Sequence, residues 1–185
     1  MTRACRWTHL ALLRGINVGG NNLVRMEELK ACLTEAGLGD VRTFIASGNV
    51  LFASRTSSTA VLEAKIEKAL EASFGRPIAV VVLERSALAA VVERAPKGFG
   101  GASFKNNVLF CKRPLTAARA LAAVTPKPGV DTATAANGVL YFATLKAKAP
   151  RSSLSRLVST PEYKLLTIRN WNTTVKLHEL FSSPA

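Results

Sequence analysis

The sequence predicts an α+β fold made of two ferredoxin-like βαββαβ units related by internal duplication. Strand-like and helix-like segments alternate in the same order through both halves of the 185-residue chain. Proline and glycine cluster between Pro96 and Gly101, where one series of elements ends and the next begins. Residues 50–52 (VLF) follow the first predicted hairpin as residues 139–141 (VLY) follow the second, at an offset of 89 residues.

The predicted domain boundaries follow from this cluster of proline and glycine residues. We expect a first unit over residues 1–95, a linker over residues 96–104 and a second, strongly basic unit over residues 105–185. A chain of this length is long enough to bury one full core or two small ones. The length of the chain is therefore compatible with two compact units, each with its own small core.

Helix and strand signals justify each element of the first unit in turn. A helix begins near Met26, where apolar residues recur at helical spacing, and stops at Gly37, a typical C-terminal cap. Ser57 to Thr59 offer an N-terminal cap for a second helix, and Ser47 with Gly48 separates two strand-like runs as a hairpin. The predicted elements are strands over residues 7–13, 41–46, 49–53 and 77–83, and helices over residues 26–36, 61–74 and 86–94.

The second unit repeats this order. Asn137 and Gly138 lie between two runs of strand-forming residues and predict a hairpin. An alanine-rich segment precedes that hairpin and favours a helix. The predicted elements are strands over residues 107–111, 130–134, 139–144 and 165–168, and helices over residues 116–124, 152–159 and 171–181.

Composition indicates a cytoplasmic protein that does not enter membranes. No apolar run approaches the roughly 20 residues that span a bilayer, and the opening MTRACRW is too short and too charged for a signal peptide. The three cysteines, Cys5, Cys32 and Cys111, share no CxxC spacing, so neither a disulfide framework nor a zinc site is expected. Cys32 and Cys111 are interpreted as reduced core residues. We expect no cofactor and no bound metal.

The charge is strongly basic and unevenly distributed. The chain has a net charge of +13, and residues 96–185 alone carry 13 Lys and Arg against 3 Asp and Glu. Such an asymmetry favours attraction to an anionic small molecule or to nucleic acid. The alternative is that the charge reflects coding composition and solubility only.

A glycine-rich turn is the most specific local motif of the chain. Residues 11–29 (ALLRGINVGGNNLVRMEEL) run from an apolar strand through this turn into an amphipathic helix. A glycine turn between strand and helix aims backbone N–H groups at one point and commonly holds a phosphate or carboxylate. Gly15 and Gly20 fit part of a P-loop, but Asn21 and Asn22 replace its lysine and hydroxyl residue, so nucleotide hydrolysis of that type is not expected.

The predicted topology brings this turn to the same end of the sheet as the first hairpin. The fold by itself requires only the glycines of these turns, and it does not explain the polar residues beside them. We therefore expect one ligand site there. Asparagines in tight turns also bond their own backbone, so pure turn architecture is the competing interpretation. The candidate ligand-binding residues of this half are Arg14, Asn17, Gly19, Gly20, Asn21, Arg25, Ser47 and Asn49.

A second polar group precedes the last predicted helix, in the segment RNWNTTVKL. The guanidinium of Arg169 is a rigid fork suited to phosphate, and polar groups surround it at a helix start. The alternative is a helix cap followed by core packing. The candidates here are Arg169, Asn170, Asn172 and Lys176.

Catalytic groupings are weak. His9 lies in a predicted strand and His178 on the last helix, and neither has a predicted partner for acid–base chemistry. Ser47 has no evident base beside it, so it is not expected to act as a nucleophile. We expect no catalytic residues.

The motifs LLRGINVGG, SGNV and RNWNT, found in this order, resemble the family catalogued as domain of unknown function 1697. The resemblance covers most of residues 8–181 and implies an α/β fold of ferredoxin-like character. It implies no activity. Family members usually carry lysines after the double glycine, whereas Asn21, Asn22 and Leu23 stand there in this chain.

These observations predict a cytoplasmic protein that binds an anionic ligand or a nucleic-acid backbone without catalysis. One alternative is a small metal-independent enzyme that acts on a phosphorylated metabolite and uses the glycine turn to hold the anion. Another is a dimerising interaction protein, and a homodimer is compatible with either function.

Overall fold

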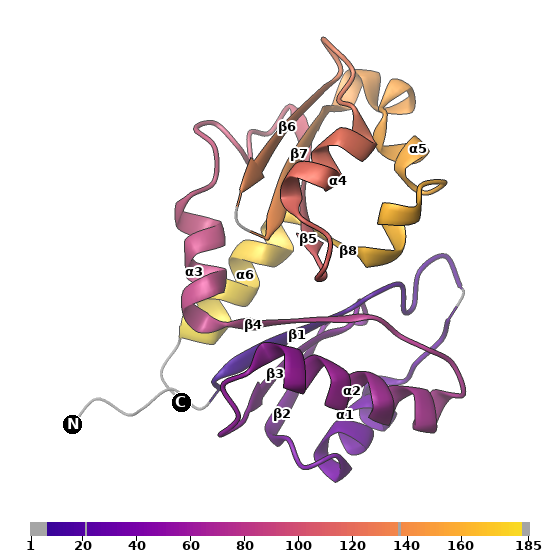
Figure 1. The fold of residues 1–185 in the computed structure, drawn as a ribbon. Helices are drawn as coiled ribbons and strands as arrows, with labels where there is room; N and C mark the ends of the chain where they lie inside the picture. The colour runs from indigo at the N-terminus through magenta and orange to yellow at the C-terminus, as the bar shows by residue number, and fades with distance from the viewer. Residues whose placement is uncertain (1–6, 21, 137, 183–185) are drawn as a thin grey trace, which may run out of the picture. The chain divides into compact units, whose positions relative to one another are not determined.

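The computed structural model describes residues 7–20, 22–136 and 138–182. The chain folds as two compact units (Figure 1). Unit 1 runs to Ala90 and also includes the chain from Leu177 onward, and unit 2 comprises Val91–Lys176. The division therefore falls earlier than the expected linker over residues 96–104, and the end of the last helix groups with unit 1 instead of unit 2.

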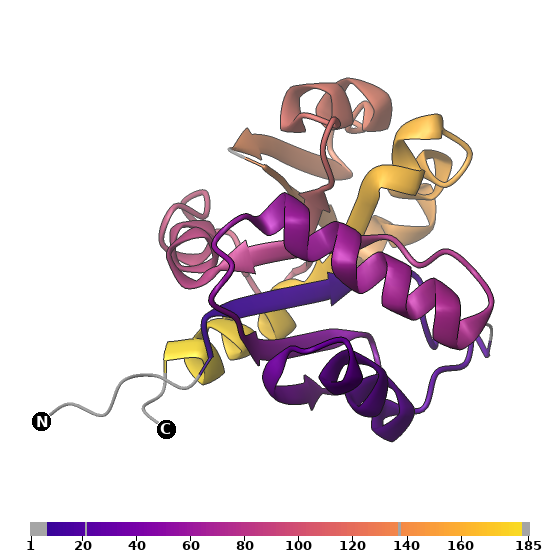
Figure 2. The same ribbon diagram turned by 60° about the horizontal axis from the view of Figure 1, so that its bottom comes forward.

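Unit 1 contains a four-stranded antiparallel sheet with strand order β2-β3-β1-β4. Helices α1 and α2 lie side by side on one face of this sheet (Figure 2). The elements are β1 (His9–Leu13), α1 (Met26–Glu35), β2 (Gly39–Phe44), β3 (Asn49–Ala53), α2 (Thr59–Phe74), β4 (Val80–Glu84) and α3 (Arg85–Glu93).

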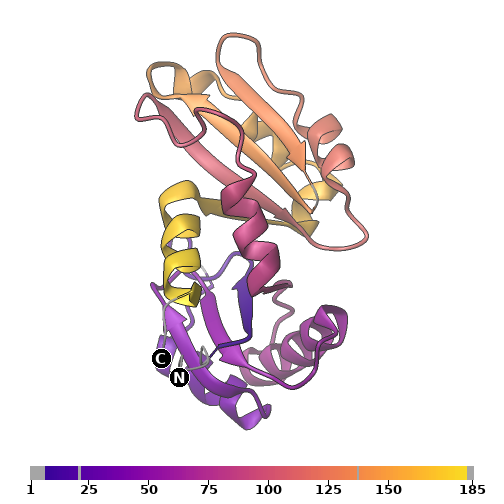
Figure 3. The ribbon, with the colours of Figure 1, turned by 90° about the vertical axis from the view of Figure 1, so that its left-hand side faces the viewer.

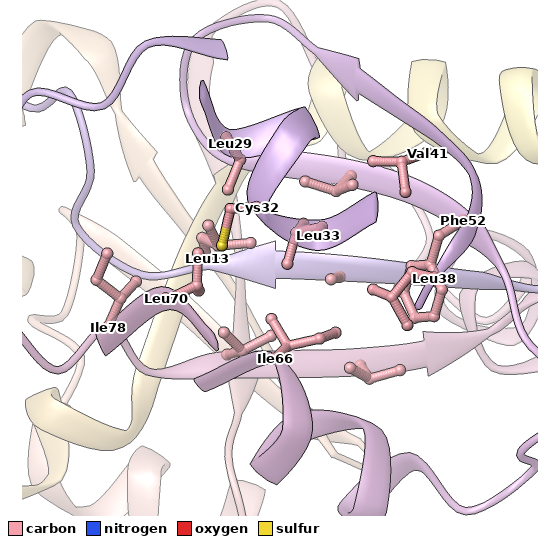
Figure 4. Close-up of a cluster of buried hydrophobic side chains, with 14 of the residues drawn as sticks. Leu13, Leu29, Cys32, Leu33, Leu38, Val41, Phe52, Ile66, Leu70 and Ile78 are labelled. Atoms are coloured by element: carbon pink, nitrogen blue, oxygen red, sulfur yellow. The ribbon is translucent and has the colours of Figure 1, made fainter. Parts of the chain in front are cut away.

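The core of unit 1 forms between α1, α2 and the sheet (Figure 4). Leu29 and Leu33 of α1 and Ile66 of α2 are fully buried there. Helix α2 begins where the Ser58 side chain accepts a hydrogen bond from the Val61 N–H, and it ends at Gly75, whose φ of 68° only glycine adopts readily. Helical periodicity thus places one apolar stripe of each helix against the sheet.

Unit 2 contains a second antiparallel sheet with the equivalent strand order, β6-β7-β5-β8, in which β6 and β7 form the hairpin (Figure 3). The β7–β8 crossover is two 3₁₀ segments around one short helix, not the single helix predicted over residues 152–159. The elements are β5 (Phe104–Cys111), α4 (Ala117–Val124), β6 (Asp131–Ala136), β7 (Val139–Leu145), η1 (Lys146–Arg151), α5 (Leu154–Leu157), η2 (Pro161–Leu165), β8 (Leu166–Asn170) and α6 (Trp171–Ser182).

The two faces of this second sheet have different neighbours. Leu109, Leu140 and Phe142 point to the core that contains α4 and α5. The strand register puts Asn106 opposite Ala143, and Tyr141 opposite Val108 and Thr134, so these residues alternate onto the other face. That other face contains the pocket described below.

Cys32 and Cys111 are free and buried, as expected for core residues, whereas Cys5 lies outside the described residues. Burial raises the pKa of the Cys111 thiol to about 11, which keeps it protonated and unreactive at neutral pH. Within the described ranges, no helix is long and apolar enough to cross a bilayer.

Candidate functional site

The glycine-rich turn and the first hairpin meet through Asn17. Its Nδ2 donates to the carbonyl oxygens of Val24 at 2.9 Å and Ala46 at 2.8 Å. Its Oδ1 accepts a hydrogen bond from the Val24 N–H at 2.8 Å. Asn17 has a φ of 54°, which asparagine tolerates in tight turns. The amide of Asn17 therefore joins the two loops and is already used within the protein.

Asn49 has a comparable structural role in the hairpin. Its side chain is fully buried, and Nδ2 donates to Phe44 O and Ser47 Oγ, each at 3.0 Å. A Cβ at Gly48 would lie 2.8 Å from the Leu13 Cβ and 2.9 Å from the Ile16 Cδ1, so only glycine fits this position. The hairpin is held closely against the end of β1.

The remaining candidates of this half surround those turns. Gly19 and Gly20 have φ values of 58° and 78°, and no atom lies within 4 Å of a Cβ built at either position. Arg25 is exposed, and Arg14 is partly buried with its backbone N–H bonded to Ala79 O. Asn21 lies outside the described residues. The structure thus brings the predicted loops together, but the side-chain amides of Asn17 and Asn49 are hydrogen-bonded within the turns.

Arg169 lies on β8 in unit 2, with only 7% of its surface exposed. Its Nη1 donates to the Ile168 carbonyl oxygen at 2.9 Å. Burial lowers the pKa of this guanidinium to about 10, which leaves it charged at neutral pH. The arginine therefore lies within the protein instead of extending from its surface.

The neighbours of Arg169 form the start of α6. Asn170 Oδ1 accepts a hydrogen bond from the Asn172 N–H at 2.9 Å, and Thr174 Oγ1 donates to Asn170 O at 3.1 Å. Lys176 is exposed on α6. These bonds agree with the cap interpretation of Asn170.

A pocket of about 210 Å³ lies on the face of the unit 2 sheet away from α4. Phe99 covers part of that face and makes edge-to-face contacts with Tyr141 and Trp171, at centroid distances of 5.3 and 5.2 Å. The Tyr141 hydroxyl donates to Val91 O at 2.6 Å. The residues lining the pocket are Pro96, Lys97, Gly98, Phe99, Phe104, Asn106, Thr132, Thr134, Tyr141 and Ala143.

Asn106 is the unusual polar residue of this pocket. Only 6% of its surface is exposed, and its Nδ2 donates to the carbonyl oxygens of Gly101 and Phe104, both at 3.2 Å. Its buried Oδ1 has no hydrogen-bond partner. A buried acceptor without a partner is uncommon in folded proteins and calls for an explanation. The sequence pattern gave no indication of this group, because the strand was expected to begin at residue 107.

Basic residues gather at one end of the unit 2 sheet. Lys105, the second residue of β5, lies opposite Thr144, and the Lys146 N–H donates to Ser103 O at 2.9 Å. The Lys148 ammonium donates to Gly129 O at 3.0 Å, which places it beside the turn that precedes β6. We call this group the basic end; its members are Lys105, Lys127, Lys146, Lys148 and Arg151.

The acidic residues of unit 2 are too few to offset most of this charge. Asp131 is buried and accepts hydrogen bonds from Thr144, Ser152 and Ser153 at 2.7–2.9 Å. Burial alone raises the pKa of Asp131, but these bonds together outweigh burial and hold the pKa below its ordinary value. Among the residues that the structure describes, no group of three or more His, Cys, Asp or Glu side chains is arranged to hold a metal ion.

The motifs around Asn17, Gly48 and Asn49 agree with a match to a family profile. The profile described as "Protein of unknown function (DUF1697)" matches residues 7–141. The chain belongs to this family. The match contains all of the sheet of unit 1 and the strands β5 and β6 of unit 2.

A solved structure shows the same fold across both units. It is that of a conserved bacterial protein, SP0830, from Streptococcus pneumoniae, with 27% sequence identity and a TM-score of 0.82. The similarity covers 95% of this chain and 99% of that chain. An unknown protein from Galdieria sulphuraria reaches a TM-score of only 0.26 at 13% identity over 89% of this chain and 96% of that one, which is too low for a structural argument. No curated protein matches the chain.

Proposed function

We propose that the protein binds an anionic cytoplasmic partner without catalysing a reaction, and that the basic end of unit 2 holds the backbone of a nucleic acid. The charge of Val91–Lys176 carries this proposal, because 14 Lys and Arg in that range stand against only 3 Asp and Glu. A field of one sign attracts polyanions and raises the rate of their association.

The positions of the three acidic residues strengthen the argument. Asp131 is buried and bonded within the protein, and Glu162 forms an ion pair with Arg119 at 3.4 Å. Glu93, at the end of α3, is the third. With only three carboxylates in this range, one of them paired with Arg119, most of the positive charge of unit 2 is not neutralised.

The shape of the chain at the basic end supports contacts with several phosphates. The short η1 segment turns sharply after β7 and carries Lys146, Lys148 and Arg151, all of which are exposed. Lys105 is exposed on the adjacent strand β5. Side chains spread over two elements suit an extended phosphate backbone better than one small anion.

The loops of unit 1 are a weaker candidate for the anion site. Asn17 and Asn49 use their amides within the turns, which leaves the backbone of Gly19 and Gly20 together with Arg25 as potential contacts. We retain them as a secondary proposal. The equivalent strand orders of the two sheets also support the proposal that both units are ferredoxin-like and arose by duplication.

A variant with four neutralised side chains tests the proposed function. The variant Lys105→Gln/Lys146→Gln/Lys148→Gln/Arg151→Gln removes exposed charge from the basic end. The matched control Lys30→Gln/Arg55→Gln/Lys65→Gln/Lys68→Gln removes four exposed charges from unit 1. We expect the first variant to bind a random single-stranded 20-mer on the order of 100-fold more weakly at about 50 mM salt. Equal losses in both variants, or no binding by the unaltered protein, would contradict the proposal.

A further inference from the structure

We infer that the pocket of unit 2 binds a flat heteroaromatic ring with an amino group, of the nucleobase class, and that Asn106 Oδ1 accepts a hydrogen bond from that amino group. The inference goes beyond the proposed function, because it uses none of the side chains of the basic end. It rests on the combination of an unpartnered buried acceptor, an aromatic lining and a small pocket volume.

The hydrogen bonds of Asn106 determine which group it offers. Nδ2 donates to two carbonyl oxygens, those of Gly101 and Phe104. Turning the amide over would place Oδ1 against these two acceptors, so the network fixes the orientation of the side chain. The group that lacks a partner is therefore an acceptor, and an N–H or O–H donor would satisfy it.

The lining of the pocket favours a flat ring as the body of that ligand. Phe99, Phe104 and Tyr141 line the pocket, and the edge-to-face contact between Phe99 and Tyr141 holds the two rings in place. The volume of about 210 Å³ lies below the roughly 300–1,000 Å³ typical of sites for drug-sized ligands, so one small ring system fits better than a large molecule.

The polar groups beside the rings suit the remainder of a nucleoside or nucleotide. Thr132 and Thr134 are exposed on β6, and their hydroxyls can donate to or accept from sugar oxygens. Lys97 is exposed and supplies a positive charge for a phosphate. The Tyr141 hydroxyl is bonded to Val91 O, so this residue contributes its ring instead.

Binding of neutral nucleosides tests this inference independently of the basic end. Adenosine and cytidine each carry a single donor on the base, the exocyclic amino group, and N6,N6-dimethyladenosine and N4,N4-dimethylcytidine lack it. We expect at least one of the two parent nucleosides to bind in calorimetry, and its dimethyl analogue to bind at least about tenfold more weakly. Because nucleosides are uncharged, the basic-end variant should bind them as the unaltered protein does.

Variants of Asn106 separate ligand binding from the support that Nδ2 gives to the 101–104 turn. When its carboxyl is protonated, Asn106→Asp keeps an acceptor oxygen and offers one O–H donor in place of the two Nδ2 bonds, whereas Asn106→Ala loses both the donor and the acceptor. We expect Asn106→Asp to bind nucleoside better in mild acid than at neutral pH, where the ionised carboxylate is repelled by the two carbonyl oxygens, and Asn106→Ala to lose binding at both pH values, with melting curves recorded for both variants. Thr116→Ala on the other side of the sheet is a control that should bind normally.

The inference is overturned if neither adenosine nor cytidine binds. It is also overturned if the dimethyl analogues bind as tightly as the parent nucleosides. Loss of oligonucleotide binding in the basic-end variant, with nucleoside binding unchanged, would support both proposals separately. Nucleoside binding without any oligonucleotide binding would support the pocket and contradict the proposed function.

Discussion

The carboxylate of Asp131 accepts hydrogen bonds from both the backbone N–H and the hydroxyl of Ser153, at 2.8 and 2.9 Å. This pair fastens the start of β6 to the segment between η1 and α5. Ser152 and Thr144 add bonds to the other carboxylate oxygen, at 2.7 and 2.9 Å. The same contacts make Asp131 unavailable to ligands, and they hold the chain that carries the basic end.

Asp131→Asn should therefore destabilise unit 2. The substitution removes the charge and places an NH₂ group against hydroxyl and N–H donors, so we expect the free energy of unfolding to fall by about 3 kcal/mol. Urea denaturation at neutral pH measures this change. Ser155→Ala, which removes an exposed hydroxyl from the same segment, should change stability by less than about 0.5 kcal/mol.

The loss of folding stability at acidic pH should depend on the carboxylate of Asp131. The pKa of Asp131 in the folded protein is below its ordinary value of about 3.9, so its stabilising contribution is present above that pH. The contribution is lost as the pH falls through the folded-state pKa. Denaturation midpoints measured at a series of acidic pH values should converge for the wild type and Asp131→Asn; parallel curves would contradict this assignment.

His9 should make unit 1 less stable in mild acid. The ring is buried, stacks on Phe52 at 5.4 Å, and leaves Nε2 without a hydrogen-bond partner. Burial lowers the pKa of His9, and the carboxylate of Glu84 opposes burial only in part. The unfolded chain consequently takes up the proton first as the pH falls through about 6.5, and stability declines from that point toward the folded-state pKa.

Melting temperatures of His9→Phe between about pH 7.5 and 5 test that expectation. Phenylalanine preserves the stacked ring and cannot titrate, so we expect this variant to lose less stability than the wild type over that interval. His178→Asn removes the other histidine of the chain and serves as the control. If His178→Asn abolishes the pH dependence and His9→Phe does not, the assignment to His9 is wrong.

Gly100 should tolerate a side chain less well than Gly98. Both have positive φ, 93° and 82°, but only at Gly100 would a Cβ meet a neighbour, lying 2.6 Å from the Trp171 Nε1. We expect Gly98→Ala to cost about 1 kcal/mol of stability through backbone strain and Gly100→Ala to cost about 2 kcal/mol or more. Indole fluorescence should change in Gly100→Ala alone; equal effects of both substitutions would argue against this packing.

The turns of unit 1 allow a similar comparison. A Cβ at Gly48 would overlap with Leu13 and Ile16, whereas a Cβ at Gly20 has open space around it. We expect Gly48→Ala to lower the free energy of unfolding by about 3 kcal/mol and Gly20→Ala by about 1 kcal/mol. Chemical denaturation of the two variants gives both values. A Gly20→Ala variant as unstable as Gly48→Ala would show that the glycine-rich loop has contacts beyond its own backbone.

Apolar periodicity predicted most elements but was misleading where polar residues are buried. β1, α1, β3 and α2 follow the expected spacing closely, because one stripe of each faces the core. β5 begins at Phe104 instead of residue 107, since Lys105 and Asn106 precede its apolar run. The segment predicted as one helix over residues 152–159 contains only Leu154–Leu157 as α-helix, with prolines at 150 and 161 in the flanking 3₁₀ turns.

The candidate site was predictable only in part for similar reasons. The asparagines of the glycine-rich turn were identified from sequence, but whether their amides face a ligand or the backbone depends on tertiary geometry. No sequence pattern identified Asn106 as a candidate. Its importance comes from the turn at 101–104, whose carbonyl oxygens accept hydrogen bonds from Nδ2 while Oδ1 is left without a partner. The basic character of the second half was evident from composition. That its lysines gather around η1 could be recognised only from the strand register of the structure.

The salt dependence of oligonucleotide binding tests most directly whether the basic end holds a nucleic-acid backbone. The logarithm of the association constant for a random single-stranded 20-mer should fall linearly with the logarithm of salt concentration. If all five side chains of the basic end contact phosphates, the slope should be about −3.5, and neutralising four of them should make it shallower by nearly 3. A slope near zero, or the same slope in the basic-end variant, would contradict the account.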